Sequence, residues 1–483
     1  MAFEPILRRR TKIVATIGPA CDEPSVLDAL IMAGTDMARL NFSHGKPEEH
    51  IERASRVRAS AKRMGRHVSI LGDLSGPKIR IEQFKDGAVE LNEGEEFTLD
   101  VALAAGAGTK KSVGCAYKDL IHDVHEGDTL LLNDGLIVLD VTGVTGSRVL
   151  TRVSVGGNLS DNKGLNRRGG GLSAGAITDK DRSDIELAAY IGVDYLGVSF
   201  PKTADDMLEA KRLLRVAGGL GRTVAKIERT EAILNLDDII LASDAVMVAR
   251  GDLGVEVGYA ELTGLQKRII RSARHHFRVV ITATQMMESM ILNPMPTRAE
   301  VSDVANAVLD GTDAVMLSAE SAIGRYPVKA VETMAQVIVG AEKYQFQRGK
   351  RPLQISDETF HATDEAIARV AMYAANHMDV RAIVALTESG STPLWMSRIR
   401  SDIPIFAFTR HETTQRRVNL YRGVYPVAFD VTHIGVDALY SSICAELLRL
   451  KLCGAGDLVI VTKGDFSGVA GGTNAMKILR VTQ

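Results

Sequence analysis

The feature that most constrains the fold of this chain is a series of eight short runs rich in Val, Ile and Ala, each leading into a polar cluster. The runs occupy residues 12–18, 37–43, 68–74, 195–200, 223–228, 245–252, 279–284 and 314–320. Alternation of such runs with helix-like segments is typical of parallel strands joined by crossover helices. Eight units that close on themselves form an α/β fold, the (β/α)8 or TIM barrel, with its active site at the carboxyl ends of the strands. We therefore predict this barrel over residues 1–76 and 176–345.

Two further domains are expected. Residues 75–194 are far more than one crossover helix needs, and their short alternating strands predict an inserted all-β domain over residues 77–175. Gly76-Pro77 and the glycine-rich, basic stretch 163–171 suit hinges, so this domain is a candidate lid over the barrel mouth. After a polar segment, runs at 382–386, 405–409, 424–429 and 458–464 predict a C-terminal doubly wound α/β domain over residues 346–483.

Composition excludes several classes of protein. The 483 residues are 45% hydrophobic and 24% charged, too apolar for a disordered chain and too charged for a membrane protein. Because 58 Lys and Arg stand against 60 Asp and Glu, no global basic field is available to hold nucleic acid or an anionic membrane. The four cysteines lack the spacing of a metal or redox site, and no targeting or membrane segment is evident. We expect a cytoplasmic protein.

Charged side chains gather at the predicted carboxyl ends of the strands. Lys226 and Glu228 share one face of their strand because they are two residues apart. Glu228 and Asp252 end adjacent strands, and two carboxylates with open positions suit Mg²⁺. Lys226 and Glu228 alone could form an ordinary ion pair at the rim, but their convergence with Asp252, Arg39 and Thr284 favours a catalytic site.

This combination indicates phosphoryl transfer. The charge of a phosphoryl group in flight spreads over oxygen atoms that need fixed positive partners, here an ammonium, a guanidinium and a metal ion. The chain has no Walker A motif and no kinase glycine-rich loop, so a nucleotide must be held in another way.

Long segments of the chain resemble the pyruvate kinase family, in its bacterial type. They include TKIVATIGPA, ARLNFSHG, DLSGPKIR, MVARGDLGVE, TATQMMESMI and PTRAEVSDVANAVLDGTDAVMLSAESAIGRYP. The resemblance covers nearly the whole chain. It implies an enzyme of glycolysis that converts phosphoenolpyruvate and ADP to pyruvate and ATP, and it implies a homotetramer.

The resemblance also implies roles for the barrel residues. Arg39 would hold the phosphoryl group, and Lys226 would stabilise the phosphoryl group and the enolate oxygen. Glu228 and Asp252 would bind Mg²⁺ or Mn²⁺, and the backbone N–H groups of Gly251 and Asp252 would bind the substrate carboxylate.

A proton path is implied at the last two strands. Thr284 would lie where the enolate carbon is protonated, and Ser318 with Glu320 would complete the path. For Ser318 and Glu320, a buried hydrogen-bonded pair with a purely structural role is an equally good interpretation.

Nucleotide and potassium sites are implied as well. Three residues of the lid region, Arg80, Asp134 and Lys163, would contact ADP or its second metal ion. The family's potassium site maps onto Asn41, Ser43, Asp73 and Leu74. Lys78 stands where many members carry Glu, and its fixed ammonium could supply the charge that potassium brings. We therefore predict that potassium is dispensable.

The C-terminal domain contains a candidate effector site. Its loop joins a predicted strand to a helix-like segment and comprises Thr387, Glu388, Ser389, Gly390, Ser391 and Thr392. Hydroxyl and backbone N–H groups at such a turn suit phosphate, and the resemblance implies an allosteric sugar phosphate or AMP. The segment 464–474 resembles the other wall of that site.

Two other functions stay open at this point. One is another barrel enzyme that forms an enolate, such as a phosphoenolpyruvate mutase or an aldolase, which would not need the lid contacts with ADP. The other is a sugar-phosphate sensor that has lost catalysis. Retention of Lys226, Glu228, Asp252 and Thr284 argues against a sensor, because a degenerate site usually loses its ligands.

Overall fold

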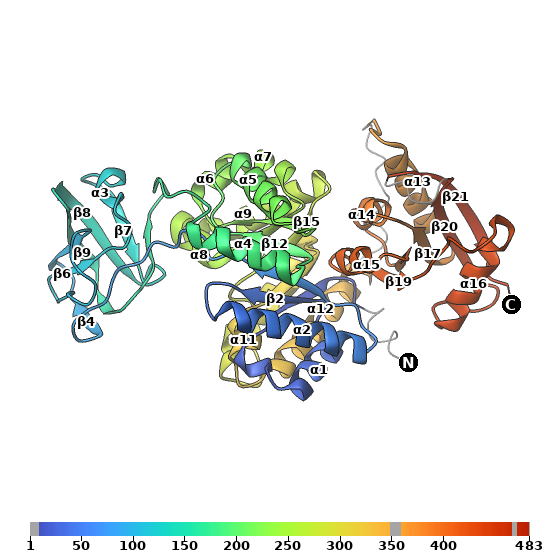
Figure 1. Ribbon diagram of the computed structural model, residues 1–483, viewed down its shortest axis with the longest axis horizontal. Helices are drawn as coiled ribbons and strands as arrows, with labels where there is room; N and C mark the ends of the chain where they lie inside the picture. Colours follow the sequence, from blue (N-terminus) through green and yellow to red (C-terminus); the bar gives the residue numbers. More distant parts are fainter. Residues whose placement is uncertain (1–8, 348–358, 466–470, 483) are drawn as a thin grey trace.

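Eight parallel strands close into a barrel at the centre of the molecule (Figure 1), and each predicted run contributes one strand. This computed structural model describes residues 9–347, 359–465 and 471–482. In order around the barrel the strands are β1 (Lys12–Thr16), β2 (Met37–Asn41), β3 (Ser69–Asp73), β12 (Tyr195–Val198), β13 (Arg222–Ile227), β14 (Ala245–Ala249), β15 (Val279–Ala283) and β16 (Ala314–Leu317). The pairing of β16 with β1 closes the circle, which confirms the predicted barrel.

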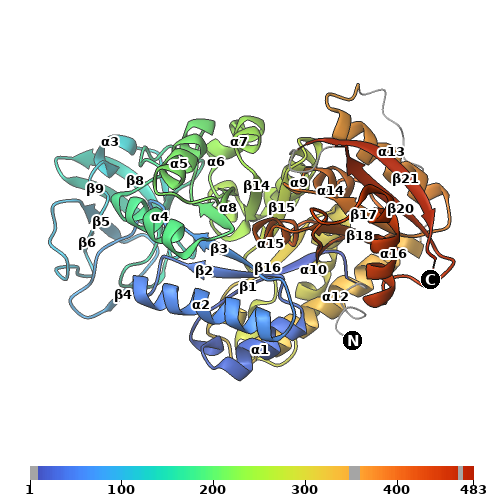
Figure 2. The ribbon, with the colours of Figure 1, turned by 45° about the vertical axis from the view of Figure 1, so that its right-hand side comes forward.

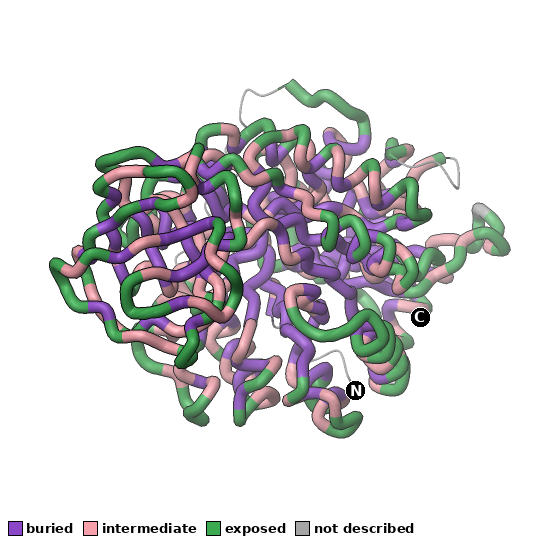
Figure 3. The backbone as a smooth tube through the Cα atoms, turned by 60° about the vertical axis from the view of Figure 1, so that its left-hand side comes forward, coloured by how far each residue is buried: buried purple, intermediate pink, exposed green. Residues whose placement is uncertain are grey.

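The barrel strands are covered on both faces, and in Figure 3 their buried backbone runs through the middle of the molecule. Parallel strands that are buried on both faces have continuous apolar sequences, and for this reason the strands could be recognised from the sequence. Val14, Met37 and Ile281 are among the side chains of the inner cluster, whereas Ile13 and Val246 pack beneath the helices. The outer helices are α1 (Pro24–Ala33), α2 (Pro47–Arg63), α4 (Asp179–Ile191), α5 (Ala204–Val216), α6 (Thr230–Leu234), α7 (Leu236–Ala242), α8 (Arg250–Val257), α9 (Tyr259–His275), α10 (Arg298–Asp310), α11 (Ala319–Ala322) and α12 (Pro327–Gln347).

An all-β lid follows β3. Its six-stranded sheet has the order β11-β7-β8-β9-β5-β6, and β10 pairs with β4. The elements are β4 (Ala88–Leu91), β5 (Glu96–Asp100), β6 (Ser112–Gly114), α3 (Leu120–Asp123), β7 (Thr129–Leu132), β8 (Ile137–Thr145), β9 (Arg148–Val155), β10 (Gly157–Ser160) and β11 (Leu165–Arg167). A separate apolar cluster that includes Phe97, Leu130 and Val149 forms its core.

The return from the lid differs from the flexible hinge that its sequence suggests. Part of the stretch 163–171 is strand β11, which pairs with β7. Arg167 binds Asp128 of the lid at 2.7 Å, and the backbone N–H of Gly169 donates to the carbonyl oxygen of Glu256 in the barrel. Arg167, one of the basic residues of this stretch, therefore anchors the segment to the lid.

The C-terminal domain is a five-stranded sheet of order β19-β18-β17-β20-β21. Four of its strands match the predicted runs and are parallel, whereas β21 is antiparallel to β20 and was not predicted. The elements are α13 (Thr363–His377), β17 (Val380–Leu386), α14 (Ser391–Ser397), β18 (Ile405–Thr409), α15 (Glu412–Val418), β19 (Val424–Ala428), α16 (Leu439–Arg449), β20 (Leu458–Gly464) and β21 (Thr473–Arg480).

The lid and the C-terminal domain lie on opposite sides of the barrel in Figures 1 and 2. The lid is inserted after the carboxyl end of β3, whereas the C-terminal domain contacts the amino ends of the strands. Two contacts illustrate the second interface: the Tyr195 hydroxyl donates to the carbonyl oxygen of Arg417, and Arg398 binds Asp313 just before β16. Across the described residues, no helix is both long and apolar enough to span a membrane.

Candidate active site

Lys226 lies at the centre of the polar cluster at the carboxyl end of the barrel. Its Nζ atom lies 2.6 Å from the Ser199 hydroxyl, 3.0 Å from Glu228 and 3.3 Å from Asp73. Burial favours the neutral amine, but Asp73 and Glu228 outweigh it and raise the pKa of Lys226. The side chain is 12% exposed, so a charged ammonium is held at the floor of the barrel mouth.

Asp73 joins the two cations of the site. Its carboxylate accepts a 2.6 Å hydrogen bond from Arg39, which also donates to the Thr16 hydroxyl at 3.0 Å. Burial favours the neutral acid, but Lys226 and Arg39 together lower the pKa of Asp73. The sequence placed Asp73 only in a potassium site, whereas the structure makes it the shared counter-ion of Arg39 and Lys226.

The two predicted metal ligands have different surroundings. Glu228 is buried and accepts a 2.8 Å hydrogen bond from the Phe200 backbone N–H. Burial, together with repulsion from Asp252 and Asp73, raises its pKa despite the opposing effect of Lys226. Two carboxylates that repel each other fit a divalent cation, which would satisfy both.

Lys78 supplies a positive charge to this pair of carboxylates. Its Nζ atom lies 3.0 Å from Asp252. It makes no hydrogen bond with Asn41 or Ser43 among the described contacts; instead, the Ser43 backbone N–H donates to Asn41 at 3.2 Å. The carbonyl oxygen of Leu74, another residue of the implied potassium site, accepts the Ser199 hydroxyl at 2.7 Å.

Thr284 has an unusual backbone conformation. Its φ is 65° and that of Gln285 is 53°, a left-handed region that is costly for a β-branched residue. The Thr284 hydroxyl accepts a 2.8 Å hydrogen bond from Gly251 N–H, one of the two groups assigned to the substrate carboxylate. The turn after β15 is therefore joined directly to the start of α8.

Arg250, which the sequence places at the carboxyl end of its strand without a role, holds this turn. Its guanidinium donates to the carbonyl oxygens of Ala283, Thr284 and Gln285 at 3.3, 2.8 and 3.2 Å, and it forms a 2.6 Å ion pair with Asp303. An arginine at the end of an apolar strand, directly before Gly-Asp, was the signal that could have identified it.

Glu320 faces the backbone. Its carboxylate accepts hydrogen bonds from the N–H groups of Ser318 at 2.7 Å and Met287 at 3.1 Å, and burial raises its pKa. No hydrogen bond joins the side chains of Ser318 and Glu320 among the described contacts. This arrangement favours the structural interpretation of the pair.

The three predicted nucleotide residues surround Gly164 at the base of the lid. Arg80 forms an isolated antiparallel β-bridge with Gly164, and its guanidinium donates to the carbonyl oxygen of Asn162 at 2.9 Å. Lys163 precedes Gly164, and Asp134 lies in the turn whose Asn133 N–H donates to the Gly164 carbonyl oxygen. Asp134 is exposed with a φ of 56°. Residues far apart in the sequence thus come together.

Comparison with known proteins agrees with this geometry. Residues 8–331 match the family model for the pyruvate kinase barrel domain, and residues 365–479 match that for the pyruvate kinase alpha/beta domain. The chain belongs to the pyruvate kinase family. Pyruvate kinase II of Salmonella typhimurium (strain LT2) is 57% identical over 479 residues, which cover 98% of this chain and 99% of that protein. Membership of the pyruvate kinase family makes this chain a phosphotransferase.

Two further pyruvate kinases support the assignment. That of Haemophilus influenzae (strain Rd) is 54% identical over 463 residues, covering 94% of this chain and 96% of its own. A crystal structure of a pyruvate kinase from Cryptosporidium parvum superposes with a TM-score of 0.90 at 32% identity and covers 99% of this chain and 97% of its own.

In this member of the pyruvate kinase family, the predicted effector loop lines a cavity of about 150 Å³ in the C-terminal domain. Thr387, Glu388, Ser391 and Thr392 line it, but Ser389 and Gly390 face the barrel side of the loop. Of the segment 464–474, residues 466–470 lie outside the described residues.

Two cations missed by the sequence reasoning, Arg410 and Lys463, also line the cavity. They follow or end apolar strands, as the recognised barrel residues do. Arg410 lies 3.6 Å from Glu388, which also binds His411.

Proposed function

We propose that the barrel site transfers the phosphoryl group of phosphoenolpyruvate to ADP and so forms pyruvate and ATP. The observation that supports this proposal is the Lys226 ammonium, fixed by Asp73, Glu228 and Ser199 beside Arg39. As the bond between phosphorus and the enol oxygen breaks, charge develops on that oxygen and on the phosphoryl oxygens. Lys226 and Arg39 stabilise that negative charge without rearranging, because Asp73 already orients both side chains. An oxygen of the ADP β-phosphate forms the new bond.

Glu228 and Asp252 would hold the divalent ion. When bound, Mg²⁺ or Mn²⁺ supplies positive charge to the phosphoryl and carboxylate oxygens of the substrate. The Lys78 ammonium already lies on Asp252, so this donor set accepts a cation.

Protonation of the enolate carbon completes the reaction. We assign the proton-delivering face to Thr284, whose hydroxyl is fixed between Gly251 N–H and the carbonyl oxygen of Ala283. Ser318 and Glu320 would support the neighbouring loop, because the Glu320 carboxylate is already occupied by backbone N–H groups.

Pyruvate formation from phosphoenolpyruvate, measured with and without ADP, tests the proposal. We expect turnover that requires ADP and is lost in Lys226→Met. Consumption of phosphoenolpyruvate without ADP would instead favour a mutase or an aldolase, and binding of sugar phosphate without turnover would favour a sensor.

We also keep the prediction that potassium is dispensable. Its support is the Lys78 ammonium, which lies 3.0 Å from Asp252 and adds a monovalent positive charge to the barrel mouth. Activity in tetramethylammonium buffer should rise less than about twofold on addition of KCl. This rise is small compared with the tenfold change that about 1.4 kcal/mol produces. A large stimulation would contradict the prediction.

Regulation is a further part of the proposal. We assign a phosphorylated effector, a sugar phosphate or AMP, to the cavity lined by Thr387, Ser391, Arg410 and Lys463, in a homotetramer. The support is two cations beside a hydroxyl-rich loop. Arg410→Gln should abolish activation by sugar phosphates and leave the unactivated rate unchanged; retained activation would contradict the assignment.

A further inference from the structure

Phe200 has a backbone conformation that is unusual for an aromatic residue. It follows strand β12, and its φ is 56°, in the left-handed region that glycine occupies readily and bulky side chains avoid. Its side chain is buried, so the conformation is not that of a loose surface turn. Residues other than glycine that are held in this region cluster at functional sites, where the surrounding structure compensates for the strain. The contacts of Phe200 should therefore reveal what its conformation achieves.

The backbone of Phe200 orients one of the two proposed metal ligands. Its N–H group donates a 2.8 Å hydrogen bond to the Oε2 atom of Glu228, which is buried. The other carboxylate oxygen, Oε1, lies 3.0 Å from the Nζ atom of Lys226. These two partners together fix the plane of the Glu228 carboxylate. Groups that hydrogen-bond to a metal ligand set its orientation and tune the affinity for the metal.

The ring of Phe200 lies against the first of the two segments that connect the lid to the barrel (Figure 1). Gly76, whose φ is 66°, belongs to the hinge predicted at the start of the lid. A Cβ atom added at Gly76 would lie 2.9 Å from the Cδ2 atom of Phe200 and 2.7 Å from the Cβ atom of Ser199. Real Cβ atoms do not approach their neighbours so closely, so only glycine allows the hinge to pass this near to the ring.

The same ring is linked to the second connecting segment through Arg229. The Arg229 guanidinium lies over the ring, 5.2 Å from its centroid, and donates to the carbonyl oxygen of Leu172 at 3.3 Å. Lys202, two residues after Phe200, donates to the same oxygen at 2.9 Å. Arg229 also directly follows Glu228 in the chain. Both connections of the lid are therefore in contact with Phe200 or with a residue that touches its ring.

Little empty space separates these groups. Phe200 and Arg229, together with Leu172 and Asp252, help to line a cavity of about 10 Å³, which has room for about one water molecule. Close packing transmits a displacement instead of absorbing it. A rotation of the lid about its hinge therefore moves the ring, and movement of the ring alters the strained backbone whose N–H group orients the metal ligand.

We propose that Phe200 is a positioning residue that couples the position of the lid to the orientation of Glu228, and hence to the affinity for the divalent ion. The ion would be held most tightly when the lid connections pack on the ring as they do in this structure. Because coupling between two sites is reciprocal, an ion bound by Glu228 would in turn stabilise the lid connections. The inference rests on the metal site proposed above for Glu228 and Asp252.

The test measures Mn²⁺ binding and lid mobility in the full-length protein without substrate. Electron paramagnetic resonance of free Mn²⁺ gives the affinity, and hydrogen exchange of residues 165–176 reports on opening of the second connecting segment. Phe200→Leu removes the ring but keeps an apolar side chain, whereas Phe200→Tyr keeps the ring. Phe84→Leu, in the core of the lid, is the matched control, and Glu228→Gln removes a carboxylate ligand. Thermal melting verifies that each variant is folded.

We expect Phe200→Leu to weaken Mn²⁺ binding about threefold to tenfold, as loss of one hydrogen bond does. Phe200→Tyr and Phe84→Leu should stay within about twofold of the wild type. Mn²⁺ should slow hydrogen exchange of residues 165–176 in the wild type but not in Phe200→Leu, because the ring that transmits the effect is missing.

Three results would overturn the coupling: wild-type affinity for Mn²⁺ in Phe200→Leu, an equal loss of affinity in Phe84→Leu, or exchange of residues 165–176 that responds to Mn²⁺ in the same way in the wild type and in Phe200→Leu. Failure of the metal site itself has a different signature. If Glu228→Gln leaves Mn²⁺ binding unchanged, the ion binds elsewhere, and the proposed metal site is refuted together with the coupling.

Discussion

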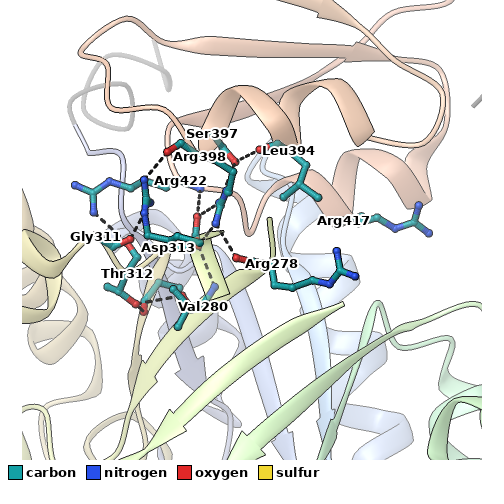
Figure 4. A network of polar contacts seen from close by, with 12 residues as sticks. Arg278, Val280, Gly311, Thr312, Asp313, Leu394, Ser397, Arg398, Arg417 and Arg422 are labelled. Carbon is teal, nitrogen blue, oxygen red and sulfur yellow. Dashed lines mark hydrogen bonds and ion pairs between the residues drawn. The ribbon is translucent and has the colours of Figure 1, made fainter. Parts of the chain in front are cut away.

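The two ends of the barrel use buried charge in different ways. At the amino end, Asp313 is fully buried, and its carboxylate accepts hydrogen bonds from Arg398 and from the backbone N–H groups of Val280 and Arg422 (Figure 4). At the carboxyl end, Asp252 has a single described ion pair, with Lys78, and both side chains are partly exposed. A saturated carboxylate holds two domains together, whereas an unsaturated one can exchange partners with a substrate or a metal ion.

The largest expected effect concerns Lys226. Lys226→Met removes the ammonium and should lower kcat about 10³-fold, as loss of a preorganised electrostatic group does. Steady-state kinetics with saturating phosphoenolpyruvate and ADP measure it, with the exposed Lys62→Met as the control. A variant that keeps more than a tenth of the wild-type kcat would refute the assigned role.

At the amino end the expected loss is one of stability. Asp313→Ala leaves Arg398 buried without its partner and should lower the free energy of unfolding by about 3–5 kcal/mol. Urea denaturation measures the change. The exposed pair of Glu209 and Arg212 provides the control, because loss of a solvent-exposed ion pair in Glu209→Gln should have a far smaller effect on the free energy of unfolding. Equal effects of the two substitutions would mean that burial of the interface pair does not matter.

An intermediate effect is expected at Arg250, which acts through Thr284. Arg250→Lys keeps the charge but loses the fork that binds three carbonyl oxygens, so Thr284 should shift and kcat should fall about 10–100-fold. Exchange of the pyruvate methyl protons with solvent reports on the Thr284 step and should fall in parallel. If exchange stays normal while KM for phosphoenolpyruvate rises, Arg250 positions the substrate carboxylate site instead. The exposed Arg268→Lys is the matched control.

The smallest expected effect is a pH dependence of the free energy of unfolding, which arises from Glu256 where the lid meets the barrel. Burial raises the pKa of Glu256 from 4.5 to about 7. The folded state therefore retains a proton that the unfolded state releases, and the stabilisation present below pH 4.5 is lost as the pH rises through about 7. Because this contact can open locally, we expect a loss of on the order of 1 kcal/mol.

Urea midpoints at pH 5.5 and 7.5 measure this loss in the wild type. Glu256→Gln should reduce the difference between the two midpoints. An unchanged difference in the variant would assign the pH dependence to other groups.

The sequence predicted those features that depend on residues close together in the chain. The eight barrel strands were legible because both faces of each are buried, and the placement of Lys226 and Glu228 followed from the two-residue repeat of a strand. Strand β21 was missed because its sequence, TNAMKILR, mixes polar and apolar residues as an edge strand exposed on one side does. The lid was recognisable because exposed and buried residues alternate regularly in strands such as β9.

Contacts between distant segments were not predictable. Nothing near Asp313 in the sequence indicates Arg398, and nothing near Lys78 indicates Asp252. The effector loop shows the same limit, because the sequence gives no sign that Ser389 and Gly390 face a different cavity from Thr387 and Thr392. Which side of a turn meets which domain is set by packing of the whole chain.

The short helix α14 has a consequence for how this protein can change by insertion and deletion. The effector loop lies at its amino end, and Arg398, which docks on the barrel, follows its carboxyl end. An added residue would rotate Arg398 by about 100° and move it about 1.5 Å, away from Asp313. The turn between β8 and β9 joins no two domains, because its Ser147 hydrogen-bonds only to Asp100 and Val101 of the lid among the described contacts. Length variation should therefore be tolerated at the tip of the lid and rejected within α14.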